Sequence, residues 1–186
     1  MIYGPKEFIL KNGLKVILRS PEKEDAYKLI EQIMSVAGST DFLLSVPEDF
    51  QHYLDDIKKE EDLIEWSKTD SGYWIIVCDK DKIVGNCSLR TYKHAKDKHR
   101  CSIGIALCKE YQSMGIGSIL FDEMIELAKK TQDIEQIELD VIDKNEKAVR
   151  LYTSKGFVKT GTIPHQLKLK DGSYLDGTTM VLFLNK

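Results

Sequence analysis

Hydrophobic and polar positions follow two different periods along the chain, and this change separates predicted strands from predicted helices. Apolar or alternating runs typical of strands cover residues 14–19, 73–78, 83–89, 101–107 and 137–142, with two final strands at 157–169 and 174–184. Helical spacing predicts a helix opened by Ser20-Pro21-Glu22, an amphipathic helix over 47–67, a third containing residues 119–128, and a short one over 145–155 closed by Gly156.

The order of these elements predicts the fold class. It is strand, two helices, three strands, helix, strand, helix and two strands. Polar turns at 79–82 and 170–173 favour antiparallel hairpins, whereas the strands on either side of the third helix need a right-handed crossover and should be parallel. We therefore expect an α+β fold in which one mostly antiparallel sheet carries a single βαβ unit, rather than a doubly wound sheet.

Length and composition limit the classes of function. The 186 residues suit one domain over 1–186, with a core at about 14–184, and no linker divides them. The net charge of −3 argues against a nucleic-acid partner, and no run is long and apolar enough for a membrane span. No signal peptide is apparent, and the four cysteines form no CxxC pair. Reduced, buried thiols in a cytoplasmic protein are therefore expected.

The most informative local feature is the stretch Tyr111-Gln112-Ser113-Met114-Gly115-Ile116-Gly117, between a strand and a helix. Two glycines there allow backbone N–H groups at a helix N-terminus to approach a pyrophosphate. A Walker loop is disfavoured because no lysine follows Gly117. A dinucleotide-binding GxGxxG fingerprint is disfavoured because Leu120 occupies the position of its third glycine. Two interpretations of this stretch remain: a coenzyme A-binding turn of the form QxxGxG, and a plain tight turn that binds no ligand.

A second motif follows about 28 residues beyond Gly117, at residues 145–157. Its residues Asn145, Ala148, Leu151, Tyr152, Gly156 and Phe157 match NxxAxxLYxxxGF. With Gln112-Ser113-Met114-Gly115-Ile116-Gly117 before it, the chain resembles the GCN5-related N-acetyltransferase (GNAT) superfamily over roughly residues 14–184. The ending, with Asp171-Gly172 followed by Met180, looks like the tail of members that acetylate protein N-termini, polyamines or small amines, but its Asp-Gly is also a hairpin turn.

The resemblance implies acetyl-CoA as co-substrate and no metal. It implies that the strand before the glycine turn splays from the strand after its helix, so that pantetheine pairs with exposed backbone. The cofactor-binding residues implied in this way are Ile105, Ala106, Leu107, Gln112, Ser113, Met114, Gly115, Ile116, Gly117 and Asn145. Ile105 and Leu107 suit a plain core equally well, and Asn145 is also a good helix N-cap.

Two side chains are candidates for the chemistry of acyl transfer. By resemblance, Tyr152 protonates the departing thiolate, although it would also pack beside Ala148 and Leu151 in an amphipathic helix. Alternation along 137–142 places Glu138 and Asp140 on one face of their strand. Asp140 matches a position where many relatives carry a glutamate and is a candidate base. Its side chain is one carbon shorter, which favours action through ordered water over direct proton abstraction. Glu138 is expected to face the surface.

The acceptor is predicted only as a primary amine, on a small molecule or a protein N-terminus. Eight acids between residues 47 and 66 would favour a cationic acceptor if they lined the cleft, but a solvated helix face explains them as well. The basic loop at 93–100 is expected to be a solvated hairpin tip, with contact to the 3′-phosphate of coenzyme A as the alternative. A homodimer is an assembly that the resemblance allows. The second hypothesis is a non-catalytic acyl-CoA-binding sensor.

Overall fold

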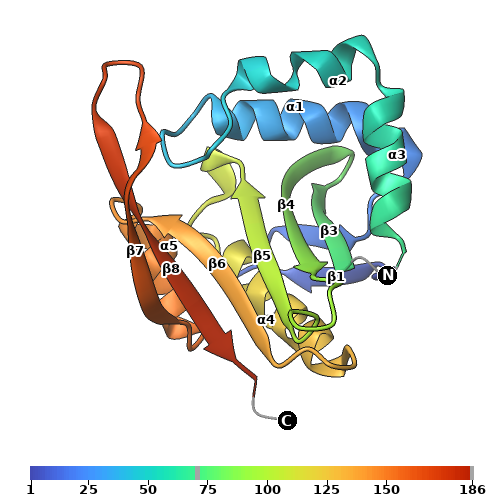
Figure 1. Ribbon diagram of the computed structural model, residues 1–186. Coiled ribbons are helices and arrows are strands. Elements are labelled where there is room, and N and C mark those ends of the chain that lie inside the picture. The colour runs from blue at the N-terminus through green and yellow to red at the C-terminus, as the bar shows by residue number, and fades with distance from the viewer. Residues whose placement is uncertain (70–71, 185–186) are drawn as a thin grey trace.

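The computed structural model describes residues 1–69 and 72–184, and within them eight strands form one sheet in the order β1-β2-β3-β4-β5-β6-β8-β7 (Figure 1). The strands are β1 (Lys6–Ile9), β2 (Lys15–Arg19), β3 (Gly72–Asp79), β4 (Lys82–Thr91), β5 (Arg100–Leu107), β6 (Gln136–Ile142), β7 (Val158–Lys168) and β8 (Tyr174–Phe183). Paired strands are antiparallel except β5 and β6, which are parallel. The predicted α+β fold with one parallel unit is confirmed.

Helices cover both faces of the sheet. They are α1 (Ala26–Ala37), α2 (Gln51–Asp55), α3 (Lys58–Ser67), α4 (Ile116–Lys130) and α5 (Glu146–Ser154), with 3-10 turns η1 (Lys23–Asp25), η2 (Pro47–Phe50) and η3 (Lys109–Tyr111). Helices α1 to α3 lie on the near face in Figure 1, and α4 and α5 lie behind the sheet. No helix of the described ranges is both long and apolar enough to cross a membrane.

Two features of the N-terminal third differ from the prediction. The edge strand β1 was not expected, because its Lys6-Glu7-Phe8-Ile9 sequence carries little apolar periodicity. The single helix expected over 47–67 is divided into η2, α2 and α3. The break lies at Asp56, which leaves helical geometry at φ −142° and ψ 79° while its carbonyl accepts a hydrogen bond from the Lys59 N–H. Aspartate competes poorly as an interior helix residue, which accounts for a break at this position.

The larger core lies between the sheet and helices α4 and α5. Three aromatic rings join the two helices: the Phe121 centroid lies 5.0 Å from that of Tyr152 and 5.8 Å from that of Phe157. Phe121 and Phe157 are fully buried. Because aromatic groups bury large areas and lock one another's rotamers, this cluster fixes the position of α5 and of Tyr152 within it.

A buried polar network holds α1 over the middle of the sheet. The Asn86 amide of β4 donates to the Gln32 side-chain oxygen at 2.7 Å, and Gln32 donates to the Ala106 carbonyl of β5 at 3.4 Å. Trp74 donates to Asn86 at 3.4 Å. Because buried polar groups are costly when unpaired, these bonds specify where α1 lies on β4 and β5.

The parallel pair β5–β6 is short, and the two strands then separate. Three residue pairs form the ladder: Arg100 with Gln136, Cys101 with Ile137, and Ser102 with Glu138. Strand β5 continues to Leu107 and β6 to Ile142 without further pairing between them in the described residues. The splayed strands implied by the family resemblance are therefore present.

One buried acid makes the stability of this fold depend on pH. Glu60 of α3 is buried, its Oε1 has no hydrogen-bond partner among the described residues, and desolvation raises its pKa from 4.5 to about 7. The folded state thus binds a proton that the unfolded state has already released. The free energy of unfolding should therefore decrease as pH rises from about 4.5 through 7, by up to roughly 3 kcal/mol, and stay level above that.

Glu60→Gln should remove this dependence, and urea unfolding at pH 5 and pH 8.5 measures it. The variant is expected to lose less stability than the wild type between the two conditions. Asp62→Asn, an exposed position on the same helix, is the control and should follow the wild type. Equal pH dependence of Glu60→Gln and wild type would show that Glu60 ionises freely in the folded protein.

Candidate active site

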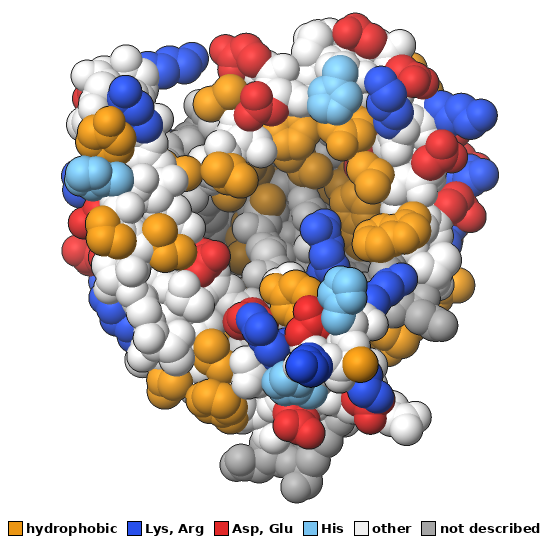
Figure 2. Space-filling model, viewed as in Figure 1, with side chains coloured by type: hydrophobic (Ala, Val, Ile, Leu, Met, Phe, Trp, Pro, Cys, Tyr) orange, Lys and Arg blue, Asp and Glu red, His pale blue; other side chains and the backbone are white. Residues whose placement is uncertain are grey.

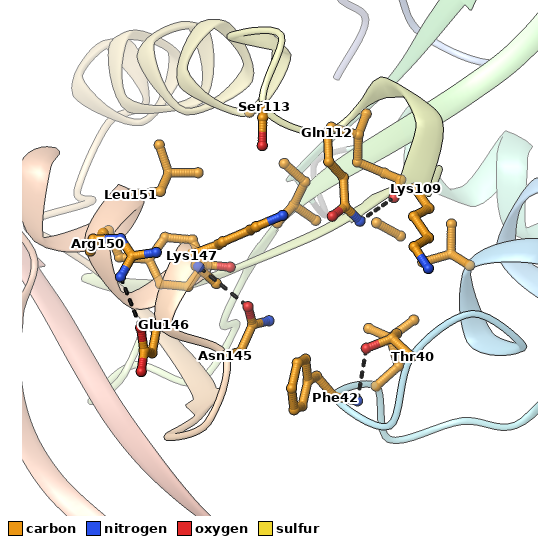
Figure 3. A pocket seen from close by; sticks show the side chains of 18 of the residues that line it. Thr40, Phe42, Lys109, Gln112, Ser113, Asn145, Glu146, Lys147, Arg150 and Leu151 are labelled. Carbon is orange, nitrogen blue, oxygen red and sulfur yellow. Dashed lines mark hydrogen bonds and ion pairs between the residues drawn. The ribbon is translucent and has the colours of Figure 1, made fainter.

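A cavity of about 860 Å³ lies where β5 leaves β6, between the N-terminal ends of α4 and α5 (Figure 3). Its walls come from four segments: the end of β5, the turn before α4, the start of α5, and the loop after α1. The lining of these four segments includes Ile105, Ala106, Leu107, Lys109, Gln112, Ser113, Gly115, Gly117, Ser118, Lys144, Asn145, Lys147, Leu151 and Tyr152. The cavity thus brings the predicted catalytic Tyr152 together with all the predicted cofactor-binding residues except Met114 and Ile116.

The turn before α4 presents unpaired backbone donors to this cavity. Ser113 and Gly115 both adopt left-handed backbone, with φ of 64° and 91°, and Gly115 is the N-cap of α4. The first N–H groups of a helix have no partner within it, and the first turn of α4 carries no acidic side chain. Such an arrangement binds an anion such as a pyrophosphate.

Gly117 allows close packing at the start of α4. A Cβ at this position would lie 3.1 Å from Cδ2 of Leu151 and 3.8 Å from Cδ1 of Ile105. The helix end therefore approaches both α5 and β5 without a side chain between them. Of the other predicted residues in this turn, Ile116 is buried in the core and the Met114 sulfur accepts a hydrogen bond from Asn12 at 3.8 Å. Neither side chain lines the cavity, so only their backbone groups are candidates for contact.

The free edge of β5 offers a second set of backbone groups. The Cys108 N–H donates to the Val84 carbonyl of β4. Since backbone groups alternate in direction along an antiparallel strand, those of Ile105 and Leu107 point away from β4, into the gap beside β6. The Gln112 side chain donates to the Leu107 carbonyl at 3.1 Å, which leaves the groups of Ile105 without a strand partner in the described residues. An extended amide chain could pair with them.

Lysines at the rim add positive charge. Lys109, Lys144 and Lys147 line the cavity, and none forms an ion pair with an acid among residues 1–69 and 72–184, whereas Arg150 is paired with Glu146 at 3.0 Å. Figure 3 shows Lys147 extending from α5 and Lys109 lying on the other side, near Gln112. Three unpaired cations around the helix N-terminus favour a polyanionic ligand. No motif marks these lysines in the sequence, whose densest basic cluster is the loop at 93–100.

Tyr152 lies at the inner end of the cavity and belongs to the core as well. Its side chain is 8% exposed, and no described residue hydrogen-bonds to its hydroxyl. Burial, and secondarily the nearby Cys87 thiol, raise the pKa of the Tyr152 phenol above its usual value of 10. The phenol is therefore protonated at neutral pH, as a proton donor must be. The predicted packing of Tyr152 in the core is therefore present, and its role as a proton donor stays a prediction.

Asn145 begins α5 and faces the same cavity. Its side-chain oxygen accepts a hydrogen bond from the Ala148 N–H at 3.3 Å, which satisfies one of the free donors of the helix. The predicted N-cap role is thus present. Because only the oxygen is used in this cap, the amide NH₂ group is left to face the cavity that Asn145 lines.

Comparison with known proteins identifies the family. The acetyltransferase (GNAT) family matches residues 37–157. The chain belongs to the GNAT family. It is 25% identical over 166 residues to the L-amino acid N-acetyltransferase AaaT of Escherichia coli (strain K12), covering 89% of this chain and 96% of that protein.

Two solved acetyltransferase structures have the same fold. A GNAT acetyltransferase from Streptococcus pneumoniae superposes with a TM-score of 0.82 at 24% identity, covering 91% of this chain and 99% of the other. The putative acetyltransferase yncA from Salmonella typhimurium, solved with acetyl-CoA, gives a TM-score of 0.77 at 18% identity, covering 92% and 95%. The splayed strands of the present chain therefore belong to a GNAT fold.

The acids of β6 lie on the opposite face of the sheet from α4 and α5. Leu139 is in the core, so Glu138 and Asp140 point to the face that carries α1 to α3. Asp140 is exposed and accepts a hydrogen bond from the Thr179 hydroxyl at 2.7 Å. It does not line the 860 Å³ cavity. The expectation for Glu138 is wrong: its side chain is only 15% exposed, because Arg100 donates two hydrogen bonds to it at 2.7 and 2.8 Å.

The wall opposite α5 was missed by sequence reasoning. It is formed by the loop after α1, whose residues Ser39, Thr40, Phe42 and Leu43 line the cavity. Figure 3 shows Phe42 and Thr40 facing the cavity from this loop. These residues carry no motif and follow no helical or strand period. Their position becomes visible only once α1 is placed on β4 and β5.

Proposed function

We propose that this GNAT-family chain is one N-acetyltransferase domain that transfers an acetyl group from acetyl-CoA to a primary amine, on a small molecule or a protein N-terminus. The observation that carries the proposal is the cavity between β5 and β6, which joins free helix N–H donors at one end to a buried, protonated Tyr152 at the other. The Salmonella typhimurium relative in fold was solved with acetyl-CoA, which supports the choice of co-substrate.

The chain offers complementary groups for each part of acetyl-CoA. The backbone of residues 112–118, with Lys109 and Lys147 at the rim, suits the pyrophosphate and the phosphorylated ribose. The free edge at Ile105 suits the pantetheine amides, and Asn145 offers a further donor. The thioester would then lie at the inner end of the cavity, toward Tyr152.

The reaction needs a neutral amine and a proton for the leaving thiolate. The amine nitrogen attacks the thioester carbonyl carbon, the new C–N bond forms, and the C–S bond breaks. Tyr152 gives its phenolic proton to the sulfur, and a base takes the proton from the amine. We assign the base to Asp140, acting through water, because its carboxylate is exposed on the face open to an acceptor and is held by Thr179.

Direct attack is favoured over an acetylated enzyme. A cysteine nucleophile must be a thiolate, but all four cysteines are buried. Burial raises the pKa of Cys101 to about 12 and also raises the pKa values of Cys78, Cys87 and Cys108. Acetyl-CoA and the amine should therefore be bound together when transfer occurs.

Intact-mass spectrometry tests direct transfer. Incubation with acetyl-CoA alone is expected to leave the protein mass unchanged, whereas addition of an accepted amine should release coenzyme A and yield the N-acetyl product. A protein about 42 Da heavier, by one acetyl group, that returns to its original mass when the amine is added would contradict direct attack. Binding of acetyl-CoA without turnover of any amine would support the sensor hypothesis instead.

A further inference from the structure

A second cavity, of about 140 Å³, lies on the face of the sheet that carries α1 to α3. It is bounded by α3 on one side and by β3 and β4 on the other, and its lining includes Leu63, Trp66, Trp74, Asn86, Ser88 and Arg90. Figure 2 shows this face hollowed between the β7–β8 hairpin and the helices, with hydrophobic side chains gathered on the helix side. The cavity opens on the face to which Asp140 also points.

Arg90 supplies an unpaired positive charge to this cavity. Cys87 and Leu89 of β4 lie in the core against α4, so Ser88 and Arg90 point to the other face. Arg90 is exposed and makes no ion pair or hydrogen bond with residues of the described ranges. The charge of Arg100, on the neighbouring strand, is not available in this way, because Arg100 donates two hydrogen bonds to the Glu138 carboxylate. Arg90 is thus available to a ligand carboxylate, which a guanidinium binds through two hydrogen bonds.

The opposite side of the cavity is apolar. Trp66 and Leu63 of α3 remain 45% and 38% exposed, and Trp74 of β3 lies beneath them. The Lys93 ammonium lies 5.8 Å from the Trp66 ring centroid, at the edge of this surface. The volume equals that of about five water molecules, at roughly 30 Å³ each. It therefore suits one apolar side chain rather than an extended peptide.

Gly104 of β5 lies beside this cavity, next to its lining residue Ser88. Ser88 pairs with Gly104 of β5, and the Ser88 Oγ lies 3.8 Å from where a Cβ of Gly104 would be. Gly104 is exposed and directly precedes Ile105, whose backbone faces the β5–β6 gap. Arg90 pairs with Ser102, so Gly104 is its diagonal neighbour on the same face, and diagonal neighbours across two strands are roughly 7–8 Å apart. A small molecule can therefore contact both Arg90 and Gly104.

We propose that the acceptor is a free α-amino acid with an apolar or aromatic side chain. Its carboxylate binds Arg90, its side chain enters the cavity beside Trp66, and its amine points over Gly104 toward the thioester. This inference rests on the proposed function and adds the class of acceptor. Polyamines lack the carboxylate, and a protein N-terminus has an amide in its place, so neither uses Arg90 in this way.

Leucine and leucinamide distinguish these acceptors, because they differ only in the carboxylate. Arg90→Gln should lower kcat/KM for leucine at least about tenfold, and change kcat/KM for leucinamide less than about twofold. Comparing variant with wild type for each substrate cancels their difference in amine basicity. Arg90→Lys should restore part of the loss. Arg100→Gln is the matched control. It should change kcat/KM for leucine and for leucinamide by the same factor, since Arg100 is already paired with Glu138.

Trp66→Ala tests the side-chain end of the same subsite. It should lower kcat/KM for leucine and phenylalanine several-fold relative to glycine, since glycine has no side chain to place in the cavity. An unchanged ratio would remove the 140 Å³ cavity from acceptor recognition.

The outcomes separate this inference from the proposed function. If Arg90→Gln lowers kcat/KM for leucine and for leucinamide by the same factor, while leucinamide, peptides or polyamines are acetylated, the amino-acid acceptor is overturned. The assignment as an acetyltransferase then remains in place. Failure of the wild type to bind acetyl-CoA in a calorimetric titration would overturn the proposed function itself. Acetyl-CoA binding without turnover of any amine would overturn both.

Discussion

Replacement of Tyr152 by phenylalanine is expected to lower kcat at least about tenfold while acetyl-CoA affinity stays within about twofold of wild type. The change removes one oxygen and its proton and keeps the ring that packs 5.0 Å from Phe121. Core packing and the position of α5 should therefore be preserved. Steady-state rates of coenzyme A release and calorimetric binding of acetyl-CoA measure the two quantities.

The pH dependence of kcat checks the same assignment. Because burial raises the pKa of Tyr152 above 10, the phenol keeps its proton throughout the neutral range, and Tyr152 should cause no loss of kcat up to pH 10. Tyr27→Phe, an exposed position on α1, is the control and should keep wild-type kcat. Undiminished turnover in Tyr152→Phe would remove Tyr152 from the mechanism.

Replacement of Gly117 by valine is expected to weaken acetyl-CoA binding about 10- to 100-fold, which corresponds to roughly 1.4–2.8 kcal/mol. The new Cβ would lie 3.1 Å from Cδ2 of Leu151, which is tighter than an ordinary contact, so the Leu151 side chain or the start of α4 must shift. The two valine methyl groups add further crowding there, and we expect a shift of the helix start to displace the backbone donors of the turn from the phosphate-binding position. Calorimetric titration with acetyl-CoA measures the loss, and thermal unfolding reports whether the fold is retained.

Gly161→Val is the matched control for the glycine substitution. Gly161 lies in β7 and is exposed, and a Cβ added there would have no heavy atom within 4 Å. The same glycine-to-valine substitution therefore causes no steric contact at this position. Acetyl-CoA affinity in Gly161→Val should equal that of the wild type. If Gly117→Val also binds with wild-type affinity, the turn before α4 has been misassigned.

Local patterns were sufficient to predict much of the fold. Hairpin turns at 79–82 and 170–173 and the crossover around α4 led to the mixed sheet with one parallel pair, because these signals depend on neighbouring residues. The glycine turn and the N-cap at Asn145 likewise lie at the predicted helix starts. Edge strand β1 escaped prediction because its sequence carries little apolar periodicity, and the break at Asp56 because the amphipathic pattern over 47–67 continues across it.

The site was predictable where motifs mark it and not where distant segments meet. Gly115, Gly117 and Tyr152 are carried by two motifs and lie at one cavity. The rim lysines, the loop at 39–43 and Arg90 have no motif, since their proximity depends on how helices cover the sheet. The Arg100–Glu138 pair joins parallel strands separated by a whole helix, and alternation within β6 alone could not reveal it.

Amine-dependent release of coenzyme A by the wild-type protein tests the central proposal most directly. The assay supplies acetyl-CoA with amino acids, their amides, polyamines and N-terminal peptides in parallel, and mass spectrometry identifies each product. We expect release that requires an amine and equals the amount of N-acetyl product formed. Absence of release with every amine, together with no calorimetric binding of acetyl-CoA, would contradict the assignment of the cavity between β5 and β6.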